Sequence, residues 1–237
     1  MSVNNVKIIY EDSDIIVCIK PQGMPAQSDR SRDLSLVNYL KNYLYEKEEM
    51  DEEPYLAIIH RLDRPVGGLM VFAKNQKAAS NLSDQVQDGI MEKDYQAILT
   101  GELPDVEGTL IDYLVKDGKT NMSKVVTKGT KGAKKAELRY EVLDVVETDE
   151  GLLSYVLIEL ITGRHHQIRV QMSSHGAGIW GDTKYNEKFR KTKKVYRQIG
   201  LFASRIAFNH PITKERMVFK EEPNGEAFDL LLDAEEF

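Results

Sequence analysis

The chain has 237 residues, of which 41% are hydrophobic and 30% are charged, and this composition is typical of a globular protein with a buried core. It contains one cysteine, Cys18, which excludes an internal disulfide framework and a cysteine metal site and favours a reducing cytoplasmic location. The segment that begins at Met1 lacks the features of a signal peptide, and no apolar stretch approaches the roughly 18 residues of a membrane span.

The apolar pattern predicts strands where short apolar runs end at Gly or Pro, and helices where apolar residues recur every three or four positions. In chain order, we expect strands at residues 6–12 and 14–20, a helix at 34–45, strands at 56–59 and 69–73, a helix at 75–87, strands at 94–101, 136–146 and 152–161, a helix at 164–174, and strands at 201–209 and 215–219. Strands outnumber helices and most are connected as hairpins. The expected fold is therefore α+β, with a mixed, largely antiparallel sheet and flanking helices. No linker is long enough to separate independent domains, so we expect a single domain over residues 1–237, composed of two subdomains that share one sheet.

An acidic residue lies between two arginines in the run His60-Arg61-Leu62-Asp63-Arg64. The strands expected at 56–59 and 69–73 flank this run, and a proline and two glycines interrupt the chain between them. The run is therefore expected on a tight loop, where a rigid scaffold can hold exposed chemical groups. An ordinary ion pair among surface side chains is the alternative interpretation, so the run needs support from the rest of the chain.

Acidic and basic residues are segregated along the chain, although the net charge of −6 weighs against a nucleic-acid partner. Basic residues gather in residues 116–139 and 184–197, and acidic residues gather in 46–53, 144–150 and 221–237. Segregation of this kind can form a basic surface on an acidic protein, and a local field attracts a polyanion more than the total charge does. A solvated loop is the alternative interpretation of each basic run.

Five groups of residues, in this order along the chain, carry a resemblance to one family. They are Tyr10-Glu11-Asp12 with Lys20-Pro21-Gln22-Gly23; His60 to Arg64 with Gly68 and Phe72-Ala73-Lys74; Lys93-Asp94-Tyr95-Gln96-Ala97; Thr162 to Val170 with Gly181-Asp182 and Tyr185; and Leu201, Ala203, Phe208, His210-Pro211 and Thr213. With these groups the chain resembles the RluA-type pseudouridine synthases, which convert selected uridines of ribosomal or transfer RNA to pseudouridine. The resemblance covers nearly the whole chain and implies the pseudouridine synthase fold and an isomerase activity.

The chain also departs from the pattern of this family at several positions. Gly67 stands where Ser is usual, His165 where Thr or Ser is usual, Gly178 where Pro is usual, Asn186 where Gly is usual and Phe202 where His is frequent. None of these positions is one to which the resemblance gives a catalytic role, so the departures bear on the choice of substrate. We also expect the chain to lack the small N-terminal RNA-binding module of many relatives, because it begins almost directly at the catalytic region.

Formation of pseudouridine breaks the bond between ribose and a uracil nitrogen, turns the base and rejoins it through a ring carbon. The reaction involves neither redox change nor hydrolysis, so we expect no nucleotide cofactor and no metal. The anomeric carbon develops positive charge as the bond breaks, and a carboxylate can stabilise or attack it, as in glycoside hydrolysis. The resemblance makes Asp63 this carboxylate. Whether Asp63 attacks the sugar, attacks the base or abstracts a sugar proton stays open.

The resemblance gives two further residues a part in the reaction. Arg169 matches the position that pairs with the catalytic acid, and a guanidinium there favours the ionised carboxylate. Arg64 is the local alternative for this role. Tyr95 matches the active-site tyrosine, whose ring can stack on an extruded uracil, an interaction of roughly 1–3 kcal/mol per base, and whose hydroxyl can help to move a proton. The other interpretations are an ordinary surface arginine and an ordinary core tyrosine.

Several basic or polar residues are expected to contact RNA. Arg61 is expected to help displace the target nucleotide, because an enzyme that acts on a paired base must extrude it. Arg164 and Gln167 stand at the start of an expected helix, which is a favourable place for phosphate oxygens. The RNA-binding residues that we expect are Arg61, Arg64, Arg164, Gln167, Lys131, Lys134 and Lys135.

The adjacent residues His165 and His166 at first suggest a metal site. Neighbouring residues of a helix point about 100° apart and rarely ligate one ion together. No clustered cysteine or acidic partner in the sequence completes such a site. We therefore expect no metal.

These patterns predict a monomeric cytoplasmic RNA pseudouridine synthase that acts on ribosomal or transfer RNA and has no membrane partner. A non-catalytic RNA-binding protein of the same fold is one alternative, and the presence of Asp63, Tyr95 and Arg169 together weighs against it. A glycosidase that acts on free nucleosides is another. The two basic runs disfavour it, because a small neutral substrate does not need them.

Overall fold

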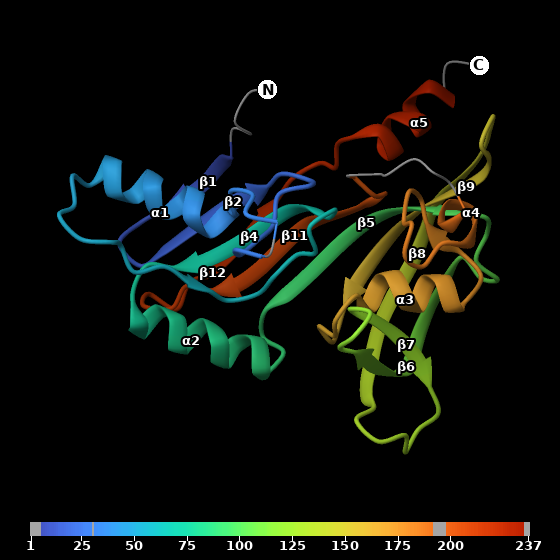
Figure 1. Cartoon of the computed structure of the whole chain (residues 1–237), viewed down its shortest axis with the longest axis horizontal. Coiled ribbons are helices and arrows are strands. Elements are labelled where there is room, and N and C mark those ends of the chain that lie inside the picture. Colours follow the sequence, from blue (N-terminus) through green and yellow to red (C-terminus); the bar gives the residue numbers. More distant parts are fainter. Residues whose placement is uncertain (1–5, 30, 192–197, 235–237) are drawn as a thin grey trace. The chain divides into compact units, whose positions relative to one another are not determined.

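The structure, a computed structural model, describes residues 6–29, 31–191 and 198–234 (Figure 1). The contacts within the chain distinguish two compact units. The first unit consists of Met1–Glu92 and Ser204–Glu221, and the second of Lys93–Ala203 and Glu222–Phe237. Each unit has its own strands and helices.

The first unit has the strand order β1-β2-β4-β11, with β3 beside β4 and β12 beside β11. Its elements are β1 (Lys7–Glu11), β2 (Ile15–Lys20), α1 (Leu36–Lys47), β3 (Ala57–Ile58), β4 (Gly67–Ala73), α2 (Gln76–Gln87), β11 (Leu201–Asn209, whose first three residues belong to the second unit) and β12 (Arg216–Lys220). The pairs β1–β2, β2–β4, β3–β4 and β11–β12 are antiparallel.

Local signals in the sequence set the ends of both helices in this unit. α1 begins after Ser35, whose hydroxyl accepts a hydrogen bond from the backbone N–H of Asn38 at 3.3 Å. α2 begins after Asn75, whose side-chain oxygen accepts from the N–H of Ala78 at 2.9 Å. Gly89, with a φ of +71°, follows the end of α2 and takes a backbone conformation that a side chain would strain.

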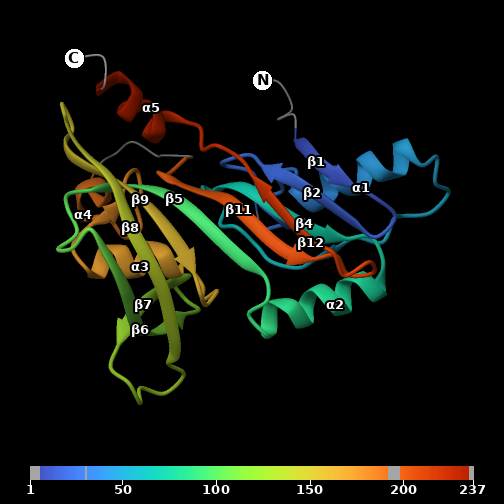
Figure 2. The same cartoon turned by 180° about the vertical axis from the view of Figure 1, so that it is seen from behind.

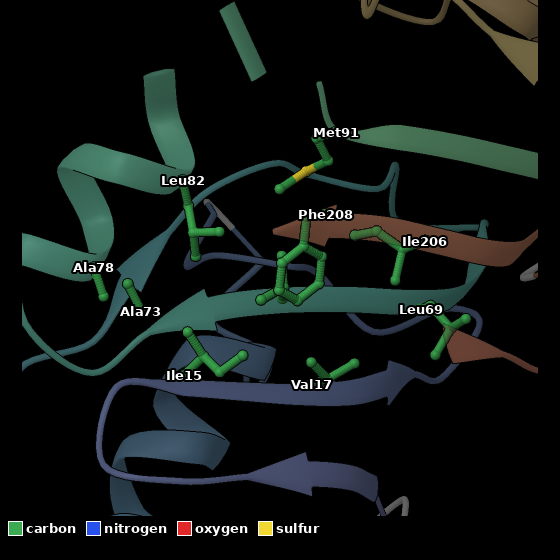
Figure 3. Packing of buried hydrophobic residues seen from close by; sticks show 10 residues of the cluster. Ile15, Val17, Leu69, Ala73, Ala78, Leu82, Met91, Ile206 and Phe208 are labelled. Atoms are coloured by element: carbon green, nitrogen blue, oxygen red, sulfur yellow. The ribbon is translucent and has the colours of Figure 1, made fainter. Parts of the chain in front are cut away.

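A hydrophobic core fills the space between α2 and the strands β2, β4 and β11 (Figure 3). Figure 3 shows Phe208 of β11 in the middle of this cluster, between Leu82 of α2 and Val17 of β2. Phe208 is fully buried, and burial of a side chain of this size contributes about 1.5–3 kcal/mol. This core supports β4 and thereby the loop that precedes it.

The second unit has the strand order β5-β9-β8-β6-β7, with β10 beside β5. Its elements are β5 (Glu92–Thr100, whose first residue belongs to the first unit), β6 (Glu107–Asp117), β7 (Met122–Val126), β8 (Lys134–Thr148), β9 (Gly151–Leu160), α3 (Gln167–Ser174), β10 (Gly178–Ile179), α4 (Glu187–Arg190) and α5 (Glu226–Ala234). These strand pairs are all antiparallel.

The helix α3 lies beside β6, β7 and β10 (Figures 1 and 2). Val170 of α3 packs in one cluster with Leu114 of β6 and Ala136 of β8, and Tyr185 joins them from the segment after β10. The covered face of these strands therefore positions α3 and its polar side chains. The mixed, largely antiparallel α+β fold expected from the sequence is confirmed.

The hairpin of β6 and β7 was not predicted from the sequence, although it contains part of the basic run at 116–139. The reason is Asp112, which interrupts the apolar alternation between Leu110 and Leu114 on the covered face. Its carboxylate accepts a hydrogen bond from Gln171 Nε2 of α3 at 2.8 Å, so a polar side chain is tolerated there. The strand expected at 56–59 also proved shorter, because β3 has only two residues.

The short helix α4 and the helix α5 were not expected from the sequence either. α3 begins three residues later than expected, because the residue before it, His166, has a left-handed backbone with a φ of +53°. Among the helices of the described residues, none combines the length and the apolar character needed to cross a membrane.

Candidate active site

The loop between β3 and β4 holds the acid that we expect to be catalytic. Leu62 is 6% exposed and anchors this loop in the core, whereas Arg61 is exposed and Asp63 is half-buried. The carbonyl oxygen of Asp63 accepts a hydrogen bond from the N–H of Val66 at 3.0 Å and closes a turn. The backbone that carries the Asp63 carboxylate is therefore held on both sides.

The ammonium group of Lys20, at the end of β2, binds the backbone of Arg64, the residue that follows Asp63 in this loop. Lys20 is fully buried, and its Nζ donates to the carbonyl oxygens of Pro21 at 2.9 Å, Met24 at 2.8 Å and Arg64 at 3.1 Å. These three acceptors match the three N–H donors of an ammonium group. Burial lowers the pKa of Lys20 to about 7, while the negative charge of Asp63 acts in the opposite direction. Lys20 therefore connects β2 with the backbone next to Asp63.

The side chain of Arg64 is directed toward the segment that follows β2. Its Nε donates to the carbonyl oxygen of Gly23 at 3.0 Å, its Nη1 donates to the hydroxyl of Ser31 at 2.9 Å, and its Nη2 pairs with Asp33. The guanidinium thus holds this segment against the loop. These contacts do not support the local alternative in which Arg64 serves as the partner of Asp63.

Arg169 lies in α3 of the second unit, and its side chain forms a buried ion pair with Asp182. Arg169 is 4% exposed and Asp182 is 1% exposed. Nε donates to Oδ2 at 2.7 Å and Nη2 donates to Oδ1 at 2.8 Å, which is a bidentate contact. The ring of Tyr185 lies under the guanidinium, with its centre 5.2 Å from Cζ. Arg169 is therefore a buried residue and not an ordinary surface arginine.

Tyr95 lies on the face of the second unit's strands that α3 covers. Tyr95 of β5 stands opposite Ile158 of β9, which in turn stands opposite Tyr140 of β8. Opposed residues share a face, and alternation along β8 puts Ala136 on that same face. Ala136 packs against Val170 of α3. The second unit therefore brings Tyr95 and the helix of Arg169 to one side of its sheet.

Asp63 belongs to the first unit, and Tyr95 and Arg169 belong to the second. The expected pair between Asp63 and Arg169 therefore stays a prediction.

The residues expected to contact RNA differ in what they do within the fold. Gln167 is 3% exposed; its Oε1 accepts hydrogen bonds from the N–H of Arg164 and the hydroxyl of Thr162, and its Nε2 donates to the carbonyl oxygen of Glu137. These bonds give Gln167 a structural role at the start of α3. Arg164 is exposed and donates from Nε to the carbonyl oxygen of Lys135 at 2.8 Å.

The three lysines expected to form a basic arm are exposed in the second unit. Lys131 lies in the turn before β8, and Lys134 and Lys135 begin that strand. Lys135 pairs with Glu137 at 2.6 Å, so part of its charge is balanced within the protein. The second basic run lies partly outside the described residues. This part is residues 192–197, which include Lys193, Lys194 and Arg197.

His165 and His166 have a structural arrangement that the sequence did not reveal. Their rings stack with centres 3.7 Å apart. Nδ1 of His165 lies 2.9 Å from the hydroxyl of Ser123, and Nδ1 of His166 lies 2.7 Å from the hydroxyl of Tyr185. Both histidines thus take part in a hydrogen-bonded network between α3, β7 and the segment after β10.

A separate cluster of Asp12, Asp14 and His210 brings together atoms that could ligate a metal. Oδ1 of Asp12 accepts from the N–H groups of Asp14 and Ile15, and its Oδ2 lies 2.9 Å from Nε2 of His210. Nδ1 of His210 accepts from the N–H of Thr213 at 3.0 Å, so in the neutral ring the proton is on Nε2 and points to Asp12. We therefore assign this cluster to the fold as a hydrogen-bonded corner.

Known proteins resemble this chain in both sequence and fold. The model of the RNA pseudouridylate synthase family matches residues 14–174. Ribosomal large subunit pseudouridine synthase D of Pseudomonas aeruginosa is 32% identical over 240 residues, which cover 96% of this chain and 71% of that protein. A protein of Helicobacter pylori named "Uncharacterized RNA pseudouridine synthase" is 29% identical over 216 residues. These residues cover 91% of this chain but 65% of the Helicobacter protein, so the chain spans about two thirds of that relative.

Two solved human structures have the same fold. RNA pseudouridylate synthase domain containing 4 superposes with a TM-score of 0.77 and 21% identity, covering 97% of this chain and 93% of its own. RNA pseudouridylate synthase domain containing 1 gives a TM-score of 0.75 and 23% identity, covering 94% and 85%. The segment matched by the family model contains Asp63, Tyr95 and Arg169 and is more than half of the chain. The chain therefore belongs to the RNA pseudouridylate synthase family.

Proposed function

We propose that this protein is an RNA pseudouridine synthase that isomerises specific uridines of ribosomal or transfer RNA. The observation that carries the proposal is the half-buried Asp63, held on a loop that the family pattern marks as catalytic. Membership of the family supports the reaction. The names of relatives such as ribosomal large subunit pseudouridine synthase D favour ribosomal RNA among the candidate substrates.

In the proposed reaction, Asp63 supplies the carboxylate that meets the anomeric carbon as the bond to the uracil nitrogen breaks. Its backbone is held by Leu62, by the turn to Val66 and by the contact of Lys20 with the next carbonyl. Such a carboxylate needs little rearrangement before the reaction, and this lowers the entropic part of the barrier. The negative charge of Asp63 raises the pKa of Lys20 against the effect of burial, so the two groups attract each other when both are charged.

The second unit supplies the other groups of the proposed site. Arg169 is the proposed charge partner of Asp63, and its bidentate contact with Asp182 uses one edge of the guanidinium. Tyr95 is the proposed stacking surface for the displaced uracil. Arg61, which is exposed on the catalytic loop, is the proposed residue for displacement of the target nucleotide.

A direct assay tests the proposal. The purified protein is incubated with unmodified transcripts of ribosomal RNA and transfer RNA, and pseudouridine is detected at single nucleotides by a carbodiimide adduct that stops primer extension. We expect new stops at one or a few uridines. RNA binding without any new pseudouridine on either class of transcript would favour the non-catalytic alternative.

We expect activity to survive exhaustive treatment with EDTA, because the proposed isomerisation requires no Lewis acid. A short unstructured RNA that contains the target uridine separates this from any magnesium that the RNA needs for folding. Single-turnover rates on that RNA before and after chelation should agree within about twofold, which corresponds to well under 1 kcal/mol in the barrier. Turnover on the short RNA that depends on added metal would contradict a metal-free reaction.

We expect Lys131, Lys134 and Lys135 to bind RNA electrostatically without taking part in the reaction. Replacing all three by Gln should weaken RNA binding and flatten the slope of log affinity against log salt by about 2 units, since each lost phosphate contact removes roughly 0.7–0.9. Turnover at saturating RNA should hardly change. Affinity is measured across a salt series, with Lys77→Gln, an exposed change in α2, as the matched control. An unchanged slope in the triple variant would assign these lysines to a solvated segment.

A further inference from the structure

The turn after β10 packs against one face of α3. Asp182 closes this turn, because its Oδ1 accepts hydrogen bonds from the N–H of Lys184 at 2.9 Å and the N–H of Tyr185 at 3.3 Å. The backbone N–H of Asn186 also donates to the carbonyl oxygen of Asp182 at 2.9 Å. The carboxylate of Asp182 therefore holds its own turn in addition to its contact with the helix.

Three residues contact this turn from α3 and the position just before it. They are His166, Arg169 and Ser173, which are spaced three and four positions apart. Arg169 forms the bidentate ion pair with Asp182, at 2.7 and 2.8 Å. Ser173 donates from its hydroxyl to the carbonyl oxygen of Tyr185 at 2.6 Å, and His166 meets the hydroxyl of Tyr185. Arg169 and Ser173, four positions apart, lie on one side of α3, and His166 contacts the same turn from the position before the helix. The turn is therefore fixed along two turns of α3 with Arg169 in the middle.

The side chain of Tyr185 is held by contacts at its hydroxyl and at its ring. Its hydroxyl oxygen accepts from the N–H of Ser123 at 2.8 Å and lies 2.7 Å from Nδ1 of His166, within hydrogen-bond distance. The ring centre lies 5.2 Å from Cζ of Arg169, and the ring packs with Val170. Tyr185 thus supports the guanidinium of Arg169 from one side while Asp182 binds it at an edge.

A guanidinium has two edges that can each bind a carboxylate with two parallel N–H donors. Asp182 occupies the edge formed by Nε and Nη2. With that edge bound and the ring of Tyr185 beneath, rotation about the last bonds of Arg169 is restricted. The direction of the other edge, formed by Nη1 and the second hydrogen of Nη2, is therefore set by the turn.

We propose that Asp182 and Tyr185 are positioning residues, which orient the second edge of the Arg169 guanidinium for its action on the catalytic carboxylate. This inference rests on the proposed function, because it takes Asp63 as that carboxylate. A displacement of about 1 Å at a reacting group can cost about 100-fold in rate. A buried ion pair that fixes the orientation of Arg169 therefore contributes to the rate and not only to the fold.

Asp182→Asn separates the two functions of this carboxylate. The Asn carbonyl oxygen can still accept from the N–H groups of Lys184 and Tyr185, so the turn is retained. Its NH2 group cannot accept from Nε of Arg169, so the bidentate contact is lost and only the bond from Nη2 to the remaining oxygen can persist. Tyr185→Leu removes the ring, whereas Tyr185→Phe keeps the ring and removes only the hydroxyl. Ser173→Ala is the matched control, since it loosens the same turn without touching Arg169.

We expect kcat to fall by about 100-fold in Asp182→Asn and by about 10-fold in Tyr185→Leu, with KM for RNA within threefold of wild type. Tyr185→Phe should stay within threefold in kcat. The acid side of the pH–rate profile should move to higher pH in Asp182→Asn and Tyr185→Leu, because a misplaced guanidinium stabilises the ionised carboxylate less. Ser173→Ala should lower only the melting temperature. A loss of kcat in Ser173→Ala as large as in Asp182→Asn, or an unchanged pH profile in Asp182→Asn, would make the turn merely structural.

A second measurement does not depend on turnover. The Nε–H signal of Arg169, identified in a 15N-labelled sample by its loss in Arg169→Lys, should exchange slowly with solvent in wild type and Ser173→Ala. It should exchange at least 10-fold faster in Asp182→Asn and in Tyr185→Leu. Rapid exchange in wild type would overturn the inference whether or not the protein forms pseudouridine. Slow exchange in a protein without activity would instead count against the proposed function alone.

Discussion

Asp63→Asn is expected to reduce formation of pseudouridine to the uncatalysed background while leaving RNA affinity within a few-fold of wild type. The amide is nearly isosteric with the carboxylate, but it carries no charge and is a far weaker nucleophile. The turn that holds the loop uses the backbone oxygen of Asp63, so the fold should be preserved. Single-turnover rates and equilibrium binding on the same RNA measure the two quantities separately.

The matched control for this variant is Asp51→Asn, the same chemical change at an exposed position of the first unit. It should leave both the rate and the affinity unchanged. Turnover of Asp63→Asn measurably above background would reject Asp63 as the catalytic carboxylate. Loss of RNA binding together with turnover would instead give Asp63 a part in substrate binding.

Arg169→Met is expected to cost far more in turnover than in RNA binding, because the proposed partner of Arg169 is a carboxylate and not a phosphate. The acid side of the pH–rate profile should move to higher pH, since the catalytic carboxylate loses a positive charge that favours its ionised form. A uniform loss of affinity with an unchanged pH profile would make Arg169 a phosphate contact.

The buried pair with Asp182 adds a second expected effect to this substitution. Removal of one partner of a buried ion pair leaves an uncompensated charge and costs about 3–5 kcal/mol of stability. Arg169→Met should therefore also lower the melting temperature. The double variant Arg169→Met/Asp182→Asn removes both charges, so it should recover much of that stability without recovering turnover. Activity that returned with stability would show that Arg169 acts only on the fold.

The elements that the sequence predicted well are those in which a local pattern agrees with the final packing. β11 begins and ends at the expected residues 201 and 209, and α2 follows its Asn75 cap and precedes Gly89. β6 was missed because Asp112 on its covered face is compensated by Gln171, a partner 59 residues away. Such compensation leaves no local signal, since either residue alone is typical of an exposed position.

The site shows the same limit of sequence reasoning. The family pattern made Asp63 and Arg169 the candidates for the site, but it did not reveal how they are held. Lys20 reaches the carbonyl oxygen of Arg64, 44 residues away, and a backbone acceptor leaves no trace in residue identity. Asp182 belongs to the Gly181-Asp182 pair of the family pattern. Its ion pair with Arg169 could not be predicted, because the sequence does not show that Arg169 is buried. The RNA contact expected for Gln167 stays a prediction, and the burial of its amide could not be read from its position in the motif.

The complete burial of Cys18 in β2 makes the protein suitable for thiol labelling as a measure of local opening. It is the only cysteine in the sequence, it is fully buried, and burial raises the pKa of its thiol to about 12. A reagent can therefore modify it only when the strands around it separate. Since β2 also ends in Lys20, the labelling rate would report how often the support beneath the Asp63 loop comes apart, and whether bound RNA slows that opening.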